Sequence, residues 1–438
     1  MFRTVILPII CFAPLFGAGI AFEPGELVVA ARSIPLREQA KVNDEVAAGQ
    51  VLRVLAIAES RLWVSRGKPG WVDQSQVLPL DQAEQFFSSA IKTTATAPSY
   101  LARGNARLAL GNHQAGLQDI RQALELSGGS SEYLEPLAYA QLAAMQLAEA
   151  AQTFQLVLAQ KPAYAPALMG RGVAYYQLGN HQAAVDDLSS AIKLEPQHAF
   201  PHKYLGALYY DQSKFELARH ELDLAITLDM FDPFARKVRG RLHFDSADYP
   251  AALADFGVAL QVAPTDIEAL TGRGIVAHAI GTDLEQAKQD FKRAVELGTE
   301  TEGDAYLWSN LGQVQMDLGE ESAAYKNLTH AIELDPAFNE ARSHRAYLIA
   351  NSRDASRGML NLAKDDVRKV FASQASRTFW DYRALAAVNA ASGDFARAYK
   401  YQQQAEETVR TTGPARFLEP AAQAKLRYHK LLAEGREK

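Results

Sequence analysis

Hydrophobic, small and polar positions recur with a period of 34 residues through five consecutive segments of the chain. Within one of them, Ala165–His198, apolar residues follow helical spacing in two stretches, Ala167–Leu178 and Gln182–Leu194. Gly179-Asn180 separates these stretches and Pro196 ends the second, because glycine and asparagine favour a left-handed turn and proline cannot continue a helix. The pattern therefore predicts one pair of amphipathic helices per segment, stacked on its neighbours. The segments begin at Ala97, Ser131, Ala165, Ala199 and Pro233.

Small residues occupy two fixed positions of the period and indicate where the paired helices cross. A residue with little or no side chain lets two helix backbones approach each other. Position 8 is Gly104, Ala138, Gly172, Gly206 and Gly240, and position 20 is Gly116, Ala150, Ala184, Ala218 and Ala252.

The spacing of Gly172 with Tyr175, and of Gly206 with Tyr209, resembles the tetratricopeptide repeat. The resemblance extends to further repeats that begin near residues 267, 305, 339 and 379. The repeat near 339 is degenerate, because it is longer and lacks the small residues. The resemblance implies a mainly α fold, a right-handed α-solenoid of helix-turn-helix repeats over residues 97–412. Residues 413–438 are expected to form a capping helix and tail.

The first 21 residues are expected to form a secretory signal peptide. Arg3 precedes an apolar run, Val5–Ile20, and the small residues before position 22 suit cleavage. We expect an exported protein, periplasmic or secreted, with an uncleaved membrane anchor as the alternative. Cys11 is the only cysteine, so the mature protein is expected to contain none.

Residues 22–80 differ in character and predict a small all-β domain. Short β-rich runs, among them Leu27–Ala30 and Val51–Ile57, are bounded by turn-forming residues. Leu62-Trp63-Val64, followed by Gly70-Trp71-Val72-Asp73, resembles the bacterial SH3-like barrel. That resemblance implies a ligand groove at Trp63 and Trp71. Core packing is the alternative and is favoured for Trp71. Residues 81–96 are expected to form a helix that connects this domain to the first repeat.

Composition and motifs exclude several classes of function. The 438 residues include 45 basic and 51 acidic ones, a formal net charge of −6. This balance argues against nucleic-acid binding and against broad attraction to anionic membranes. The chain has no HExxH, phosphate-binding-loop, G-x-S-x-G or CxxC motif. We therefore expect no enzyme, cofactor or metal site, and no membrane span after signal cleavage.

The resemblance also implies a binding surface, because first helices of successive repeats line a concave groove in this family. Aromatic anchors and cations are residue types that dominate protein interfaces. A peptide with acidic and apolar side chains, bound across repeats 3 to 5, is the leading hypothesis. The expected groove residues are Tyr139, Met169, Tyr176, Phe200, Lys203, Tyr210, Phe234, Lys237, Arg241, Phe244 and His278.

Two alternatives stay open for parts of this groove. Tyr176 and Tyr210 can pack between repeats instead of facing a ligand. The three cations, Lys203, Lys237 and Arg241, can be solvated or paired with Asp211 and Asp245.

The sequence as a whole predicts a non-enzymatic exported adaptor or scaffold. The repeats would bind a protein or peptide, and the SH3-like domain would make a second contact. One alternative is binding to cell-wall peptidoglycan, or an accessory role to a wall enzyme, through that domain. A self-assembling structural protein is a further alternative.

Overall fold

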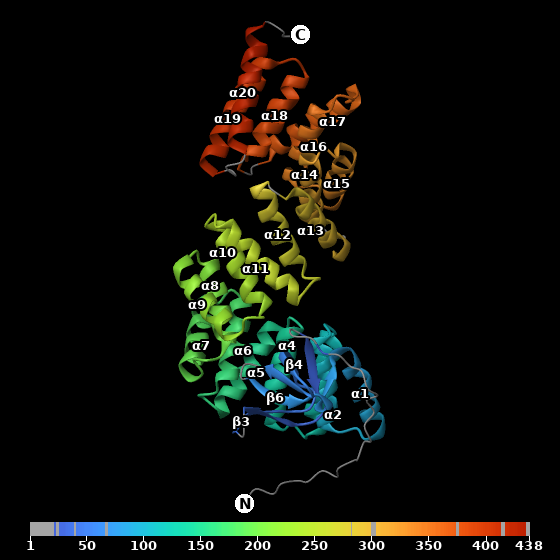
Figure 1. The fold of residues 1–438 in the computed structure, drawn as a ribbon, viewed down its shortest axis with the longest axis vertical. Helices are drawn as coiled ribbons and strands as arrows, with labels where there is room; N and C mark the ends of the chain where they lie inside the picture. Colours follow the sequence, from blue (N-terminus) through green and yellow to red (C-terminus); the bar gives the residue numbers. More distant parts are fainter. Residues whose placement is uncertain are drawn as a thin grey trace, which may run out of the picture. The chain divides into compact units, whose positions relative to one another are not determined.

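The computed structural model describes residue 22 and residues 26–38, 41–65, 69–281, 283–298, 304–373, 376–412 and 417–434. The expected signal peptide, residues 1–21, lies outside the described residues. Within the described part, a small all-β domain precedes a long series of paired α-helices (Figure 1). This arrangement confirms the predicted fold class.

The β domain is one antiparallel sheet in the order β3-β2-β6-β5-β4-β1-β7. Its inner face buries Val28, Leu36, Leu52, Val54 and Leu62. The strands are β1 (Leu27–Ala30), β2 (Ile34–Glu38), β3 (Lys41–Val46), β4 (Val51–Ala58), β5 (Arg61–Ser65), β6 (Pro69–Asp73) and β7 (Val77–Pro79).

The two tryptophans lie on the outer face of this sheet. Trp63 and Trp71 are directly opposite each other in β5 and β6, and their ring centroids are 5.2 Å apart. Their neighbours Leu62 and Val72 point inward and are buried, since side chains alternate between the faces of a strand. The core position favoured for Trp71 is therefore wrong, and its ring packs on Trp63 at the outer face.

Helix α1 (Leu80–Thr93) follows the last strand directly and packs against α2. The first helices of the repeats are α2 (Ala97–Ala109), α4 (Leu134–Ala143), α6 (Ala165–Gln177), α8 (Ala199–Asp211), α10 (Pro233–Asp245), α12 (Ile267–Ile280), α14 (Ala305–Asp317), α16 (Asn339–Asn351) and α18 (Phe379–Ala391). The second helices are α3 (His113–Leu126), α5 (Leu147–Gln160), α7 (His181–Leu194), α9 (Phe215–Leu228), α11 (Tyr249–Val262), α13 (Leu284–Leu297), α15 (Glu321–Leu334), α17 (Arg357–Ala372) and α19 (Phe395–Thr412). Helix α20 (Leu418–Ala433) packs on α19.

The helices of a pair touch where the sequence places its small residues. A Cβ added to Gly172 would lie 2.9 Å from Leu188 of the second helix, and one added to Gly206 would lie 2.7 Å from Leu222. Such distances leave no room for a side chain, which explains glycine or alanine at position 8.

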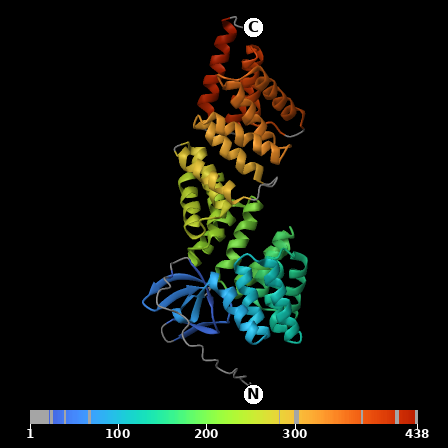
Figure 2. The ribbon, with the colours of Figure 1, turned by 90° about the vertical axis from the view of Figure 1, so that its right-hand side faces the viewer.

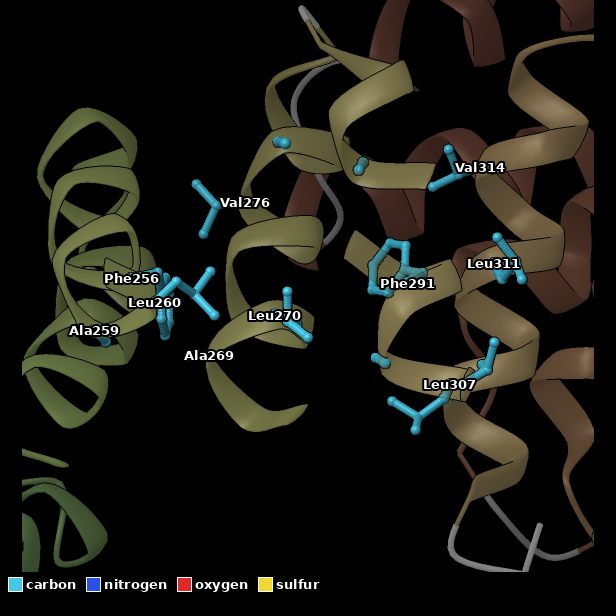
Figure 3. Packing of buried hydrophobic residues seen from close by; sticks show 14 of the residues in the cluster. Phe256, Ala259, Leu260, Ala269, Leu270, Val276, Phe291, Leu307, Leu311 and Val314 are labelled. Carbon is cyan, nitrogen blue, oxygen red and sulfur yellow. The ribbon is translucent and has the colours of Figure 1, made fainter. Parts of the chain in front are cut away.

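Apolar side chains form a core that continues from one repeat to the next. Phe256 and Leu260 of α11 meet Leu270 of α12, and Phe291 of α13 packs near Leu311 of α14 (Figure 3). No single pair encloses this core, so each repeat depends on its neighbours for burial.

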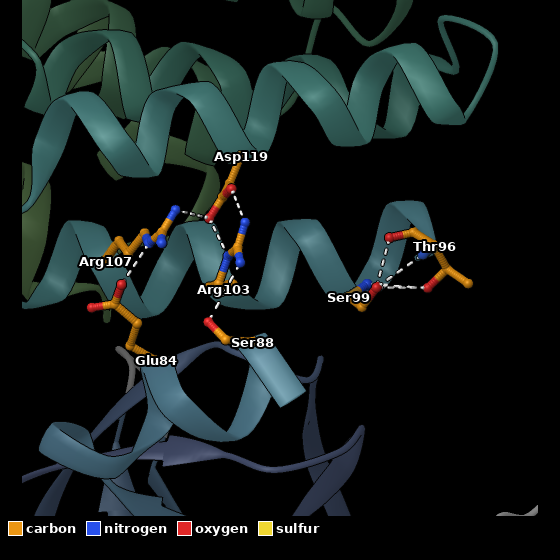
Figure 4. A network of polar contacts seen from close by, with 7 residues as sticks. All are labelled: Glu84, Ser88, Thr96, Ser99, Arg103, Arg107 and Asp119. Atoms are coloured by element: carbon orange, nitrogen blue, oxygen red, sulfur yellow. Dashed lines mark hydrogen bonds and ion pairs between the residues drawn. The ribbon is translucent and has the colours of Figure 1, made fainter. Parts of the chain in front are cut away.

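Ion pairs between a first-helix arginine and a buried second-helix aspartate link the two helices in five repeats. In the first repeat, Arg103 holds Asp119 at 2.7 Å (Figure 4). Arg107 contacts the same carboxylate at 2.9 Å and reaches Glu84 of α1, also at 2.9 Å. The other pairs are Arg171–Asp187, Arg239–Asp255, Arg273–Asp290 and Arg345–Asp366.

The chain divides into two compact units within α10. The first unit ends at Ala235 and contains the β domain, α1 to α9 and the first turn of α10. The second unit begins at Arg236 and contains the remaining repeats and α20.

Candidate functional site

In the first unit, the β domain packs against the first helices of the repeats, on the face predicted to line a groove. The turn before β4 meets α2 so closely that a Cβ on Gly49 would lie 2.3 Å from the Cα of Ala102. Val29 of the sheet, Phe87 of α1 and Ala106 of α2 share one buried cluster. Figures 1 and 2 both place the strands beside these helices.

Between the sheet and the helices lies a cavity of about 380 Å³, here called the cradle cavity. The β domain contributes Leu27, Val51 and Arg53 to its wall. Four of the predicted groove residues line the opposite side, and they are Tyr139, Met169, Phe200 and Lys203. Met169 and Phe200 are here called the apolar floor of the cradle cavity. Its charged lining residues are Arg53, Lys203, Asp229 and Asp232.

A cluster of aromatic rings surrounds the ammonium group of Lys203. Tyr204 packs on Phe200 at 4.9 Å and on Phe234 at 5.0 Å between ring centroids. Lys203 Nζ lies 5.2 Å, 5.6 Å and 5.8 Å from the centroids of Phe200, Tyr204 and Phe234. It also donates a hydrogen bond to Asp232 at 2.5 Å, so the cation is satisfied by both a carboxylate and aromatic faces.

Sequence reasoning did not select Tyr204, which is the central ring of this cluster. The available signal was its spacing, since residues four apart share one helix face and Tyr204 is four residues after Phe200. Tyr176 joins the cluster through Tyr204 at 6.4 Å and donates a hydrogen bond to Asp211 at 2.5 Å. Both of these contacts of Tyr176 are with the next repeat. They agree with the alternative that Tyr176 packs between repeats.

The pKa values of two acids beside the cradle cavity, Asp229 and Asp232, are shifted in opposite directions. Burial raises the pKa of Asp229, and the nearby charge of Asp232 raises it further. Burial also opposes ionisation of Asp232, but the charge and hydrogen bond of Lys203 outweigh it and lower the pKa of Asp232. Arg53 of β4 favours the ionised form of both acids.

The remaining predicted groove residue of the first unit lies apart from this aromatic cluster. Tyr210 packs on Phe215 of α9, with ring centroids 6.0 Å apart.

In the second unit, the two predicted cations face acids of the following repeat. Lys237 contacts Asp266 at 2.8 Å and Glu268 at 2.9 Å, and Arg241 contacts Glu268 at 3.4 Å. Of the partners considered from the sequence, Asp211 accepts a hydrogen bond from Tyr176. Lys203 and Lys237 instead pair with acids 29 residues later, which also cap the next first helix.

The last two predicted groove residues are held inside the second unit. Phe244 packs on Tyr249 of the same repeat, with ring centroids 5.8 Å apart. His278 is buried, and its Nε2 lies 2.9 Å from Asp317.

No group of three or more His, Cys, Asp or Glu side chains in the described ranges is arranged to hold a metal ion. None of the helices in that part of the chain has both the length and the apolarity that a bilayer crossing requires.

Comparison with known families matches the tetratricopeptide repeat at residues 101–165, 165–198 and 305–338. The chain contains tetratricopeptide repeats. This finding confirms, at those residues, the repeat type that the 34-residue period indicates. No family match covers the β domain, so its SH3-like character stays a prediction. The sequence has no significant match among curated proteins.

A solved structure shows the same repeat fold. The crystal structure of an APC/C hetero-tetramer, Cut9–Hcn1, matches with a TM-score of 0.56 at 16% sequence identity. The match covers 72% of this chain and 59% of that chain, so this chain spans less than two thirds of its length. A thermophilic tetratricopeptide-repeat protein of Thermus thermophilus is 26% identical, with a TM-score of 0.38, over 42% of this chain and 99% of that one. These similarities concern the fold alone.

Proposed function

We propose that this protein is a non-catalytic adaptor that receives a segment of a partner protein in the cradle cavity. The tetratricopeptide repeats support a role in protein–protein interaction. The observation that carries the proposal is the cavity itself, with Met169 and Phe200 as its apolar floor and Arg53 opposite them. An apolar side chain of the partner would pack on Met169 and Phe200.

The charged groups of the cavity are expected to orient the partner, and its apolar side chains are expected to supply most of the affinity. Lys203 is already paired with Asp232, so it holds the wall together more than it attracts a ligand. The rings and Met169 then supply most of the binding energy, because burying one large apolar side chain is worth roughly 1.5–3 kcal/mol. Charged groups contribute mainly to specificity and to the rate of association.

Replacing Phe200 with alanine tests this proposal. The Phe200→Ala variant, prepared from residue 22 onward, should bind a captured partner at least about 10-fold more weakly, because it loses the ring at the cavity floor. Partners are captured from an envelope extract with the parent chain, identified, and then titrated by calorimetry against each variant. The matched control is Phe215→Ala, which removes an exposed ring from α9. Equal affinity of the Phe200→Ala variant and the parent would contradict the proposed site.

The second part of the proposal concerns export and the β domain. The apolar run after Arg3 supports export to the periplasm or to the outside of the cell, with an uncleaved anchor as the minor alternative. The SH3-like resemblance, together with the outward-facing pair Trp63 and Trp71, supports a second contact by this domain. Arg61 lies 5.4 Å from the Trp71 ring centroid, which extends the same surface.

Peptidoglycan is the alternative ligand that this surface favours, because adjacent aromatic rings can stack on sugars and peptide bonds. The Trp71→Ala variant should then lose most of its retention on purified cell-wall sacculi in a sedimentation assay. Tyr249→Ala, which removes a ring from the second unit, serves as the control. Retention that is absent in the parent chain, or unchanged in Trp71→Ala, would rule out wall binding through this pair.

A further inference from the structure

The second unit contains a cavity of about 280 Å³ where α20 closes the last repeat. Tyr347 of α16, Arg383 of α18 and Gln402 of α19 line it, together with Arg427 and Tyr428 of α20. Two of the lining residues are arginines, and no acidic residue lines this cavity in the described part of the chain. It is here called the α20 pocket.

Arg383 is held among aromatic rings instead of beside a carboxylate. Its Cζ lies 3.8 Å from the ring centroid of Tyr347 and 5.3 Å from that of Trp380. One terminal nitrogen, Nη2, donates to Tyr347 Oη at 2.7 Å. The other, Nη1, is buried and has no hydrogen-bond partner among the described residues. A buried donor without an acceptor is costly, so this guanidinium lacks the anion that such a group normally meets.

Two other arginines of the same unit contact buried carboxylates. Arg345, on the helix that also carries Tyr347, contacts the buried Asp366 at 2.8 Å. Arg273 contacts the buried Asp290 at 2.7 Å. The residues that line the α20 pocket offer no such carboxylate to Arg383.

The other polar groups of the pocket suit an anion as well. Arg427 is exposed at the pocket and adds a second positive charge. Burial raises the pKa of Tyr428 to about 12, and the neighbouring Tyr347 contributes a smaller part of this rise. The phenol is therefore a neutral donor at physiological pH. Gln402 donates to the carbonyl of Ala421 at 3.2 Å, which fixes α20 over the pocket.

We propose that the α20 pocket binds a carboxylate group of a peptide, with Arg383 as the inner contact and Arg427 as the outer one. A guanidinium offers two parallel donors that match the two oxygens of a carboxylate. One anionic group balances the charge of the half-buried Arg383, and the surrounding rings accept the apolar part of the peptide. The site is separate from the cradle cavity and does not depend on the function proposed for it.

The carboxylate can come from an acidic side chain or from the end of a peptide chain. Calorimetric titration of the full chain with acetylated tetrapeptides of one apolar sequence distinguishes the two sources. One peptide carries an aspartate and an amidated end, one carries a free terminal carboxylate, and one is neutral. Binding by either charged peptide, at least about 10-fold tighter than by the neutral peptide, is the expected result.

Variants of both arginines keep the test decisive. Arg383→Gln should reduce the affinity for the charged peptide at least about 10-fold, and Arg427→Gln should reduce it by a smaller factor. Arg427 is exposed, so this variant decides the matter even where Arg383→Gln fails to fold. The control is Arg397→Gln, which removes the same charge from an exposed site outside the pocket.

Three results would overturn the proposal. One is equal binding of the neutral and charged peptides, or binding of none of them. Another is unchanged affinity in Arg427→Gln or in a folded Arg383→Gln. The third is inorganic phosphate displacing the charged peptides at a lower concentration than free acetate does, because that would indicate a phosphate site.

Discussion

At the scale of single residues, one backbone position of the repeat is strained in three repeats. Position 15, between the two helices of a pair, has a positive φ in eight repeats. Three of these residues carry side chains, and they are Met145 at 61°, Ser213 at 56° and Ala247 at 58°. The left-handed region costs a residue with a Cβ roughly 1–2 kcal/mol. The other five are Gly111, Gly179, Gly281, Gly319 and Gly393.

Replacing Ala247 with glycine should therefore stabilise the chain. The Ala247→Gly variant relieves the left-handed strain, which outweighs the greater freedom that glycine gives the unfolded chain, for a net gain of about 0.5–1 kcal/mol. The reverse change, Gly179→Ala, should destabilise by a similar amount. Urea unfolding followed by circular dichroism measures both. A lower stability of Ala247→Gly together with an unchanged Gly179→Ala would refute this explanation of the turn.

At the scale of the elements, the sequence predicts the helix pairs well because their signals are local and repeated. The stretch expected to be helical at Gln182–Leu194 forms α7 (His181–Leu194), and a glycine with φ of 77° precedes it. The degenerate repeat also forms a pair, α16 and α17, although its second helix is longer than most of the others. The expected lack of small residues in this repeat was wrong, because Ala346 and Gly358 occupy its positions 8 and 20, and Ala346 is fully buried.

The polar links between elements were harder to predict, although their spacing is regular. Arg171 and Asp187 are 16 residues apart, and the same spacing joins Arg103 to Asp119. Lys203 and Asp232 are 29 residues apart, as are Lys237 and Asp266. Charged residues on a helix are ordinarily solvated, so one sequence gives no reason to pair them before the helices are placed.

At the scale of the first unit, the packing of the β domain on the repeats could not be predicted from the sequence. No periodic signal connects β4 with α6 or α8, because each contact is made once and joins residues far apart along the chain. The same is true of Arg53, whose charge acts on Asp229 and Asp232 of a distant loop. The predicted groove residues all lie on first helices. Which of them line the cradle cavity and which make other contacts could be known only from the fold.

This packing gives the β domain a structural part in the candidate site. Val51 and Arg53 form one wall of the cradle cavity, and Met169 and Phe200 form the other. A partner segment bound there would touch both the sheet and the repeat helices.

Hydrogen exchange of the full chain, with and without an identified partner, tests this central claim most directly. We expect the partner to slow exchange in β4 and in α4, α6 and α8 together, because these elements enclose the cradle cavity. Slowed exchange confined to the second helices of the repeats, with β4, α4, α6 and α8 unchanged, would contradict it.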